Sequence, residues 1–253
     1  MMSSNRSLQN KLFFWIPFVF FPIIFTNFLF LRQIIKPFPE LNFIIIAISV
    51  YTLTLIILYF VLRKYKYGFK DIGLRDFKLR DIGWAILFFF IAILIWPWVS
   101  IMLKKLGIPE WEVKYSLSLF DILISFFANV LIIPMAEEII FRGFLITALK
   151  EKMNIWIACT ISIIFFALHH FCPFGIGAFI HILFWAPFPT LLFVRRKSLY
   201  AAIVMHIINN LFAYIILPWI FPFPISNLHS FLFPNSSWHY FFIFFFNFES
   251  KAR

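Results

Sequence analysis

The sequence contains few charged residues and few cysteines. Only 13% of its 253 residues are charged, whereas 63% are hydrophobic, and the mean hydropathy is +0.93. A soluble domain of this length cannot hide so much apolar surface in one core, so we expect a lipid bilayer around the chain. Two cysteines, Cys159 and Cys172, lie roughly a helix length apart in or beside one apolar segment, so they cannot easily pair with each other and we expect two free thiols.

Long apolar runs predict the fold class. A helix that crosses a bilayer needs about 20 predominantly apolar residues. The runs that meet this requirement are 12–31, 42–62, 82–103, 118–149, 154–172, 175–194 and 198–221, and a weaker run, 238–248, is short for a span. We therefore predict an all-α fold, a polytopic transmembrane helical bundle of seven to eight spans that forms a single integral membrane domain over 1–253. The run 118–149 is too long for a simple span, and Pro134 is the expected place of a bend.

Basic residues are divided unevenly between the two sets of loops. With the N-terminus placed in the cytoplasm, 14 of them lie on the inner side and 5 on the outer side. The inner set is Arg6, Lys11, Arg63, Lys64, Lys66, Lys70, Arg75, Lys78, Arg80, Lys150, Lys152, Arg195, Arg196 and Lys197, and the outer set is Arg32, Lys36, Lys104, Lys105 and Lys114. This asymmetry favours a cytoplasmic N-terminus, in what we expect to be a bacterial plasma membrane. It also accounts for the net charge of +11 without a nucleic-acid partner.

Acidic residues are scarce, which makes those inside a span informative. Among the 11 acidic residues, Glu137 and Glu138 stand out within a predicted span, and Arg142 follows them on the same segment. An ionisable group at the centre of a spanning helix costs about 2.5–3.5 kcal/mol on insertion scales. Glu138 and Arg142 are four residues apart and can pair on one helix face. Glu137 points about 100° away from Glu138, so it needs a partner from elsewhere in the chain.

Candidate partners for Glu137 lie in two later segments. His169 occurs in one of them, and His206 and Asn210 share a helix face in the other because they are four residues apart. At 1.5 Å per residue, Glu137, His169 and His206 lie roughly 20, 23 and 13 Å along their helices from the inner ends. All of them can therefore meet in the middle of the membrane. His181, in the span between, is expected to be a packing residue.

Two kinds of chemistry fit this set of side chains. Glu137, His169 and His206 could bind a divalent metal such as zinc and leave one position open for water. Alternatively, Glu137 could act as a general base on a water held with His169, while His206 and Asn210 stabilise an oxyanion. Both schemes hydrolyse an amide bond. A thermolysin-like zinc site is excluded because the sequence has no HExxH motif.

Three short motifs follow one another in separate apolar segments. They are EExxxR at Glu137, Glu138 and Arg142, FxxxH at Phe165 and His169, and HxxxN at His206 and Asn210. In order and spacing they resemble the type II CAAX prenyl endopeptidases, also called the CPBP or ABI family of intramembrane proteases. The resemblance covers about 118–221, which we predict to be the catalytic core. His170 and Asn209 double two of the motif residues, so the motifs alone do not separate each from its neighbour.

The resemblance implies a specific activity and mechanism. Glu137 and His169 would activate water, and His206 and Asn210 would form the oxyanion site. Glu138, Arg142 and Phe165 would be structural support. Although this family has also been described as metalloproteases, the resemblance implies no catalytic metal, with zinc as the alternative. We expect an endopeptidase that cleaves a membrane-associated protein or peptide, with or without a lipid modification.

Two other functions use the same residues. In a proton- or cation-coupled transporter, Glu137 and Glu138 would form the ion site, but such a protein does not need the HxxxN motif. In a non-catalytic bacteriocin-immunity or scaffold protein, the motifs would be expected to decay, whereas all three are complete here.

Overall fold

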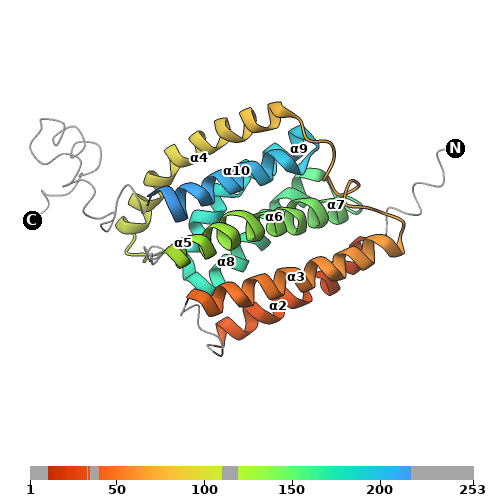
Figure 1. Cartoon of the computed structure of the whole chain (residues 1–253), viewed down its shortest axis with the longest axis horizontal. Coiled ribbons are helices and arrows are strands. Elements are labelled where there is room, and N and C mark those ends of the chain that lie inside the picture. The colour runs from red at the N-terminus through yellow and green to blue at the C-terminus, as the bar shows by residue number, and fades with distance from the viewer. Residues whose placement is uncertain (1–10, 33, 35–39, 110–118, 218–253) are drawn as a thin grey trace, which may run out of the picture.

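The computed structural model describes residues 11–32, 34, 40–109 and 119–217, and the regular structure in these residues is entirely helical (Figure 1). The elements are η1 (Phe13–Trp15), α2 (Ile16–Leu31), α3 (Glu40–Lys64), α4 (Leu79–Lys105), α5 (Leu119–Ser125), η2 (Phe126–Ile132), α6 (Ile133–Glu137), η3 (Glu138–Leu145), α7 (Ile146–Leu149), α8 (Ile155–Trp185), α9 (Pro187–Arg196), α10 (Leu199–Leu211) and η4 (Phe212–Ile216). The predicted all-α fold is confirmed, and both cysteines are free thiols.

Six helical stretches are long and apolar enough to cross a membrane. They are Phe13–Leu31, Leu41–Lys64, Leu79–Lys105, Ile122–Leu149, Ile155–Arg196 and Leu199–Ile216. The predicted number of seven to eight spans is not confirmed by this count. The difference has two sources: two predicted spans fall within the single stretch Ile155–Arg196, and the eighth predicted segment, 238–248, lies outside the described residues.

The stretch Ile155–Arg196 reverses its direction at a glycine. Gly175 has φ 85° and ψ −172°, a backbone conformation that favours glycine, and Pro173 precedes it. The rings of Phe166 and Trp185 are only 6.2 Å apart, whereas a straight helix would separate these residues by roughly 28 Å. The two predicted spans 154–172 and 175–194 therefore fold back against each other.

The long run predicted for 118–149 is helical from Leu119 to Leu149, but its hydrogen-bond register is widened in two stretches. Both η2 and η3 are π-helices, and at the end of η2 the N–H of Ile133 donates to the carbonyl of Ala128, five residues back. Pro134 follows directly, so this wider turn lies at the position where a bend was expected. π-Helical turns inside α-helices are often found at functional sites.

The loops that carry most of the basic residues gather at one end of the bundle, on the right of Figure 1. The N–H of Leu199 donates to the carbonyl of Gly73 at 2.8 Å, and the N–H of Phe13 donates to Glu151 Oε2 at 3.3 Å. Segments far apart in the sequence are thereby joined at this end. That it faces the cytoplasm stays a prediction.

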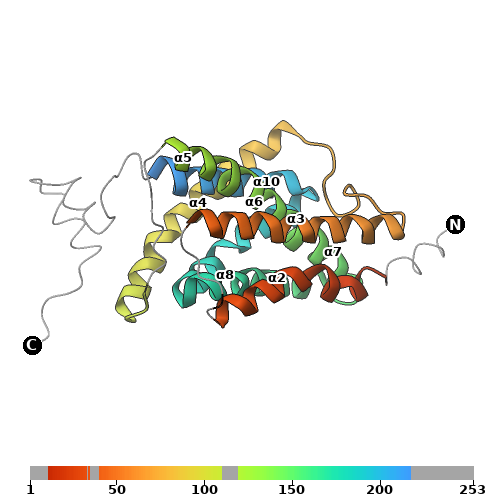
Figure 2. The ribbon, with the colours of Figure 1, turned by 60° about the horizontal axis from the view of Figure 1, so that its bottom comes forward.

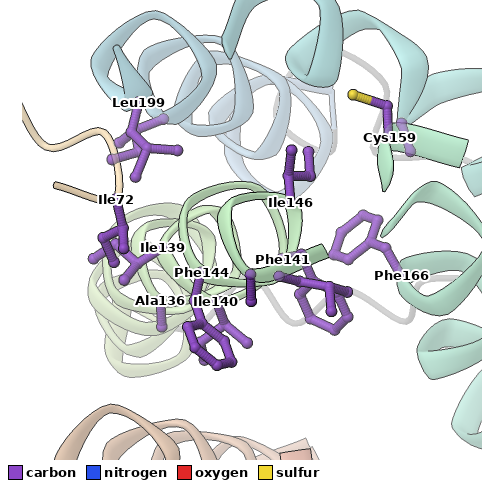
Figure 3. Close-up of a cluster of buried hydrophobic side chains, with 14 of the residues drawn as sticks. Ile72, Ala136, Ile139, Ile140, Phe141, Phe144, Ile146, Cys159, Phe166 and Leu199 are labelled. Atoms are coloured by element: carbon purple, nitrogen blue, oxygen red, sulfur yellow. The ribbon is translucent and has the colours of Figure 1, made fainter. Parts of the chain in front are cut away.

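The run α6–η3–α7 lies at the centre of the bundle and is enclosed by its neighbours. Ile140, Phe141 and Phe144 of η3 are at most 1% exposed, and Figure 3 shows them in one cluster with Phe166 of α8 and Leu199 of α10. The outer faces of α2 and α3 instead expose large apolar side chains, as expected for surfaces in contact with lipid. The central helix can therefore carry ionisable groups that do not face lipid.

Candidate active site

Glu138 and Arg142 form the predicted ion pair within η3. Arg142 Nη1 lies 3.1 Å from Glu138 Oε1, and both side chains are fully buried. The guanidinium also lies 4.2 Å above the ring of Phe166 and donates long hydrogen bonds to Thr190 Oγ1 (3.4 Å) and to the carbonyl of Ala186 (3.5 Å). The pair therefore connects η3 to α8 and α9.

The aromatic support of this ion pair comes from Phe166, one position after the predicted Phe165. Phe165 is 42% exposed and packs edge-on against Phe20 of α2. Phe166 is fully buried between Arg142 and His206, with its ring 6.2 Å from the His206 ring. The FxxxH motif thus includes a residue of the outer surface, and the supporting phenylalanine lies beside it.

His206 connects the two adjacent carboxylates. Its Nδ1 lies 2.9 Å from Glu138 Oε1, and its Nε2 lies 3.6 Å from Glu137 Oε2. Glu137 and Glu138 point in different directions, but the two ring nitrogens lie on different sides of the imidazole and can reach both. The pairing of Glu138 with Arg142 was predicted from the sequence, whereas the contact of Glu138 with His206 was not.

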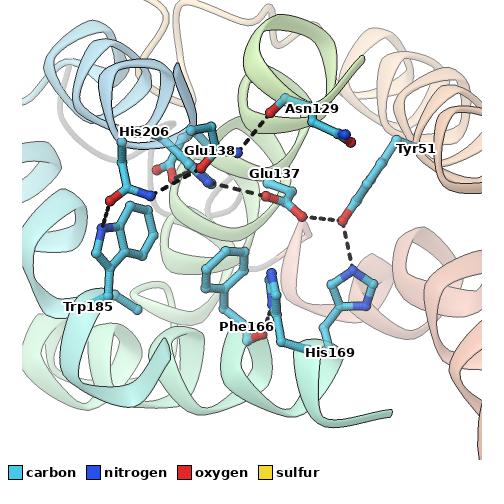
Figure 4. Close-up of polar contacts among 12 residues, drawn as sticks. Tyr51, Asn129, Glu137, Glu138, Phe166, His169, Trp185 and His206 are labelled. Carbon is cyan, nitrogen blue, oxygen red and sulfur yellow. Dashed lines mark hydrogen bonds and ion pairs between the residues drawn. The ribbon is translucent and has the colours of Figure 1, made fainter. Parts of the chain in front are cut away.

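Glu137 is also connected to His169, through a tyrosine that the motifs do not include. The Tyr51 hydroxyl of α3 donates to Glu137 Oε1 and lies 2.7 Å from His169 Nε2 (Figure 4). His169 Nδ1 lies 3.1 Å from Nδ2 and 3.2 Å from Oδ1 of Asn27 in α2. Figure 2 shows α2 and α8 side by side, with α3 next to α2. Sequence analysis missed both residues; the amide of Asn27 in an apolar run was a weak signal, and Tyr51 gave none.

The structure distinguishes the two adjacent histidines of the FxxxH segment. His169 faces Tyr51, and through it Glu137, as the motif requires. His170 Nδ1 lies 2.9 Å from the carbonyl of Phe166, and its ring packs on Phe166 and Phe174. Of the two histidines, His169 is the one connected to Glu137 through Tyr51.

Asn209 and Asn210 make different contacts. Trp185 Nε1 donates to Asn209 Oδ1 at 3.1 Å, and Asn209 Nδ2 donates to Asn210 Oδ1 at 3.2 Å. Asn210 Nδ2 donates to the carbonyl of Asn129 in η2 at 2.8 Å. An amide nitrogen carries two hydrogens, so Asn210 has a second one to offer. The described contacts of Asn210 are with these asparagines and not with Glu137 or His169.

The geometry does not suit the metal site considered from the sequence. Within the described ranges, no three His, Cys, Asp or Glu side chains are grouped so that they could hold a metal ion. The Tyr51 hydroxyl lies between Glu137 and His169, and Nδ1 of His206 is engaged with Glu138. Zinc would need all three donors at about 2.0–2.2 Å from one point.

Residues 119–212 match a family model described as type II CAAX prenyl endopeptidase Rce1-like. The matched region contains all three motifs, from Glu137 to Asn210, and the match confirms the resemblance inferred from them. It does not include α2, α3 or α4. No curated protein and no solved structure matches the chain.

Proposed function

We propose, with membership of the CPBP family as the premise, that this chain is an intramembrane endopeptidase that hydrolyses a peptide bond of a membrane-associated protein or peptide. The observation that supports the proposal is that two adjacent carboxylates have different partners. Glu138 has Arg142 as its counter-ion, whereas Glu137 is 4% exposed and bonded to Tyr51 and faces His206. An ionisable group inside a membrane costs free energy, so a second carboxylate, Glu137, that has no arginine counter-ion of its own indicates a functional role.

In the proposed mechanism, Glu137 is the general base and removes a proton from a water molecule. Oε2 is the oxygen that takes the proton, because Oε1 accepts the Tyr51 hydroxyl. The water oxygen forms a bond to the carbonyl carbon of the substrate. When the C–N bond breaks, Glu137 returns the proton to the leaving nitrogen. His169 acts on Glu137 indirectly, because the Tyr51 hydroxyl lies between the two side chains.

The oxyanion of the tetrahedral intermediate would meet donors from α10. Nδ1 of His206 is engaged with Glu138, so Nε2 is the ring nitrogen left to face the oxyanion, to which it donates when it carries the proton. Asn210 lies one turn away and has its second amide hydrogen. Glu138 holds the His206 ring, Arg142 pairs with Glu138, and the ring of Phe166 lies against the Arg142 guanidinium. This arrangement supports the oxyanion role for His206 and Asn210, with Glu138 and Arg142 as structural support.

The proposed substrate is a protein tail or peptide that enters the site from the bilayer or from its cytoplasmic face. A bacterial plasma membrane is part of the proposal. A cytoplasmic N-terminus is supported by the basic loops, which lie together at one end of the bundle. Whether the substrate is prenylated is decided by experiment.

The test compares the C-termini of membrane proteins in cells that carry the wild-type chain or Glu137→Gln. We expect extended, uncleaved C-termini to accumulate with Glu137→Gln while the protein still inserts and folds. Glu151→Gln, which removes a carboxylate outside the spans, is the control. Identical C-termini in wild-type and Glu137→Gln cells would overturn the mechanism. Proton-coupled flux in reconstituted vesicles without cleavage would favour a transporter instead.

A further inference from the structure

We infer that Tyr51 is a positioning residue of this active site, through which His169 acts on Glu137. The inference rests on the proposed peptidase function and extends the site beyond the region that carries the three motifs. Tyr51 lies in α3 and is 3% exposed, so its hydroxyl has exchanged water for protein partners. Those partners are the two residues assigned to water activation.

The direction of the hydrogen bonds follows from the single proton of the Tyr51 hydroxyl. Since this proton is donated to Glu137 Oε1, the hydroxyl oxygen has to accept from His169 Nε2–H. A neutral imidazole protonated at Nε2 has a free lone pair on Nδ1. Both ends of the Asn27 amide lie close to Nδ1, with Nδ2 at 3.1 Å and Oδ1 at 3.2 Å, and the Nδ2–H group is the donor that matches this lone pair. The contact with Tyr51 therefore selects the tautomer of His169 that is protonated at Nε2, and the amide of Asn27 can match it at Nδ1.

The same chain determines which oxygen of Glu137 meets the water. With Oε1 occupied by Tyr51, Oε2 faces His206 Nε2 across 3.6 Å. This separation is too long for a good direct hydrogen bond. A water molecule can bridge two polar groups that are not in direct contact. Tyr51 therefore holds Oε1 and leaves Oε2, the proposed reactive oxygen, facing His206 Nε2.

A structural role alone would require only that the tyrosine fill space. Phenylalanine fills the same space, so Tyr51→Phe separates the hydroxyl from the ring. The matched control is Tyr59→Phe in the same helix, because Tyr59 is 46% exposed on the outer face. Asn27→Ala tests the far end of the hydrogen-bond chain.

The experiment uses the full chain in liposomes with ¹⁵N-labelled histidine, and the His169 signals are assigned by their loss in His169→Gln. We expect the wild type to show His169 protonated at Nε2, and Tyr51→Phe to shift both ring-nitrogen signals. On the C-terminal peptides that accumulate with Glu137→Gln, Tyr51→Phe should lower kcat about 10- to 100-fold, with KM within twofold. Asn27→Ala should move the same signals with a smaller loss of kcat, and Tyr59→Phe should change neither.

Unchanged His169 signals in Tyr51→Phe would overturn the inference, whether or not a substrate is cleaved. So would a kcat within twofold of wild type for Tyr51→Phe in an enzyme that Glu137→Gln inactivates. If the wild type cleaves no peptide, the proposed function fails, and the histidine signals alone decide whether Tyr51 holds His169.

Discussion

Replacement of Arg142 by methionine should destabilise the protein severely. The guanidinium is fully buried, and it supplies the counter-ion of Glu138 at 3.1 Å together with the contact to Phe166 at 4.2 Å. Its hydrogen bonds to Thr190 and Ala186 are 3.4 and 3.5 Å long and contribute little. The dominant loss is the counter-ion, because Glu138 would keep a buried charge with only His206 beside it.

Removing one member of a buried ion pair costs about 3–5 kcal/mol. We therefore expect Arg142→Met to lower the free energy of unfolding by about 3–5 kcal/mol in a detergent titration of mixed micelles. The double variant Glu138→Gln/Arg142→Met removes the uncompensated charge and should recover more than half of this loss. Arg195→Met, at an exposed arginine of α9, should change stability by less than about 0.5 kcal/mol.

Two outcomes would refute this reasoning. A loss below about 1 kcal/mol for Arg142→Met would place the pair in the range of surface salt bridges. A double variant no more stable than the single one would show that packing of the guanidinium, and not the charge of Glu138, accounts for the cost.

Three further predictions concern packing, pH and metal. Gly143→Ala should destabilise the protein by about 1–3 kcal/mol, because the added Cβ would lie 2.8 Å from Leu199 Cδ1 and 3.0 Å from the Ile72 carbonyl. The control is Gly83→Ala in α4, whose added Cβ meets nothing within 4 Å and which should be neutral or stabilising in the same unfolding titration. Burial raises the pKa of Glu151, so the folded state binds a proton more tightly than the unfolded state. The free energy of unfolding should therefore fall as pH rises through that raised pKa. An equally steep pH dependence in Glu151→Gln would contradict this. Cleavage by the purified enzyme should survive treatment with a zinc chelator, because the donor set does not fit a metal; loss of activity that zinc restores would disprove this.

The sequence was sufficient for contacts within one helix and for the general course of the chain. The spacing of Glu138 and Arg142 predicted their ion pair, because residues four apart share a helix face in any context. The apolar runs predicted the helices to within a few residues, since bilayer thickness sets a minimum length for a span. The fold-back at Gly175 agrees with the separate runs 154–172 and 175–194.

Contacts between helices could not be predicted in the same way. Tyr51 is 86 positions from Glu137, and a tyrosine in a spanning helix does not show by itself whether it faces lipid or protein. The bridging role of His206 was missed because an imidazole can serve two carboxylates at once, and motif spacing assigns it one role. Phe166 was missed because the motif names its neighbour Phe165, and only packing shows which ring lies beneath Arg142.

The place of Tyr51 in α3 has a consequence for biosynthesis. The chain is made from its N-terminus, so α2 and α3 enter the membrane before the segment with Glu137, and the Tyr51 hydroxyl is already there to receive it. Arg142 accompanies Glu138 on the same segment, whereas His169 and His206 arrive later. If the helices insert in this order, each carboxylate has a partner when it enters the bilayer. A circular permutant that makes α2 and α3 last would force Glu137 to enter the bilayer without Tyr51, and we expect it to insert less efficiently than the natural order.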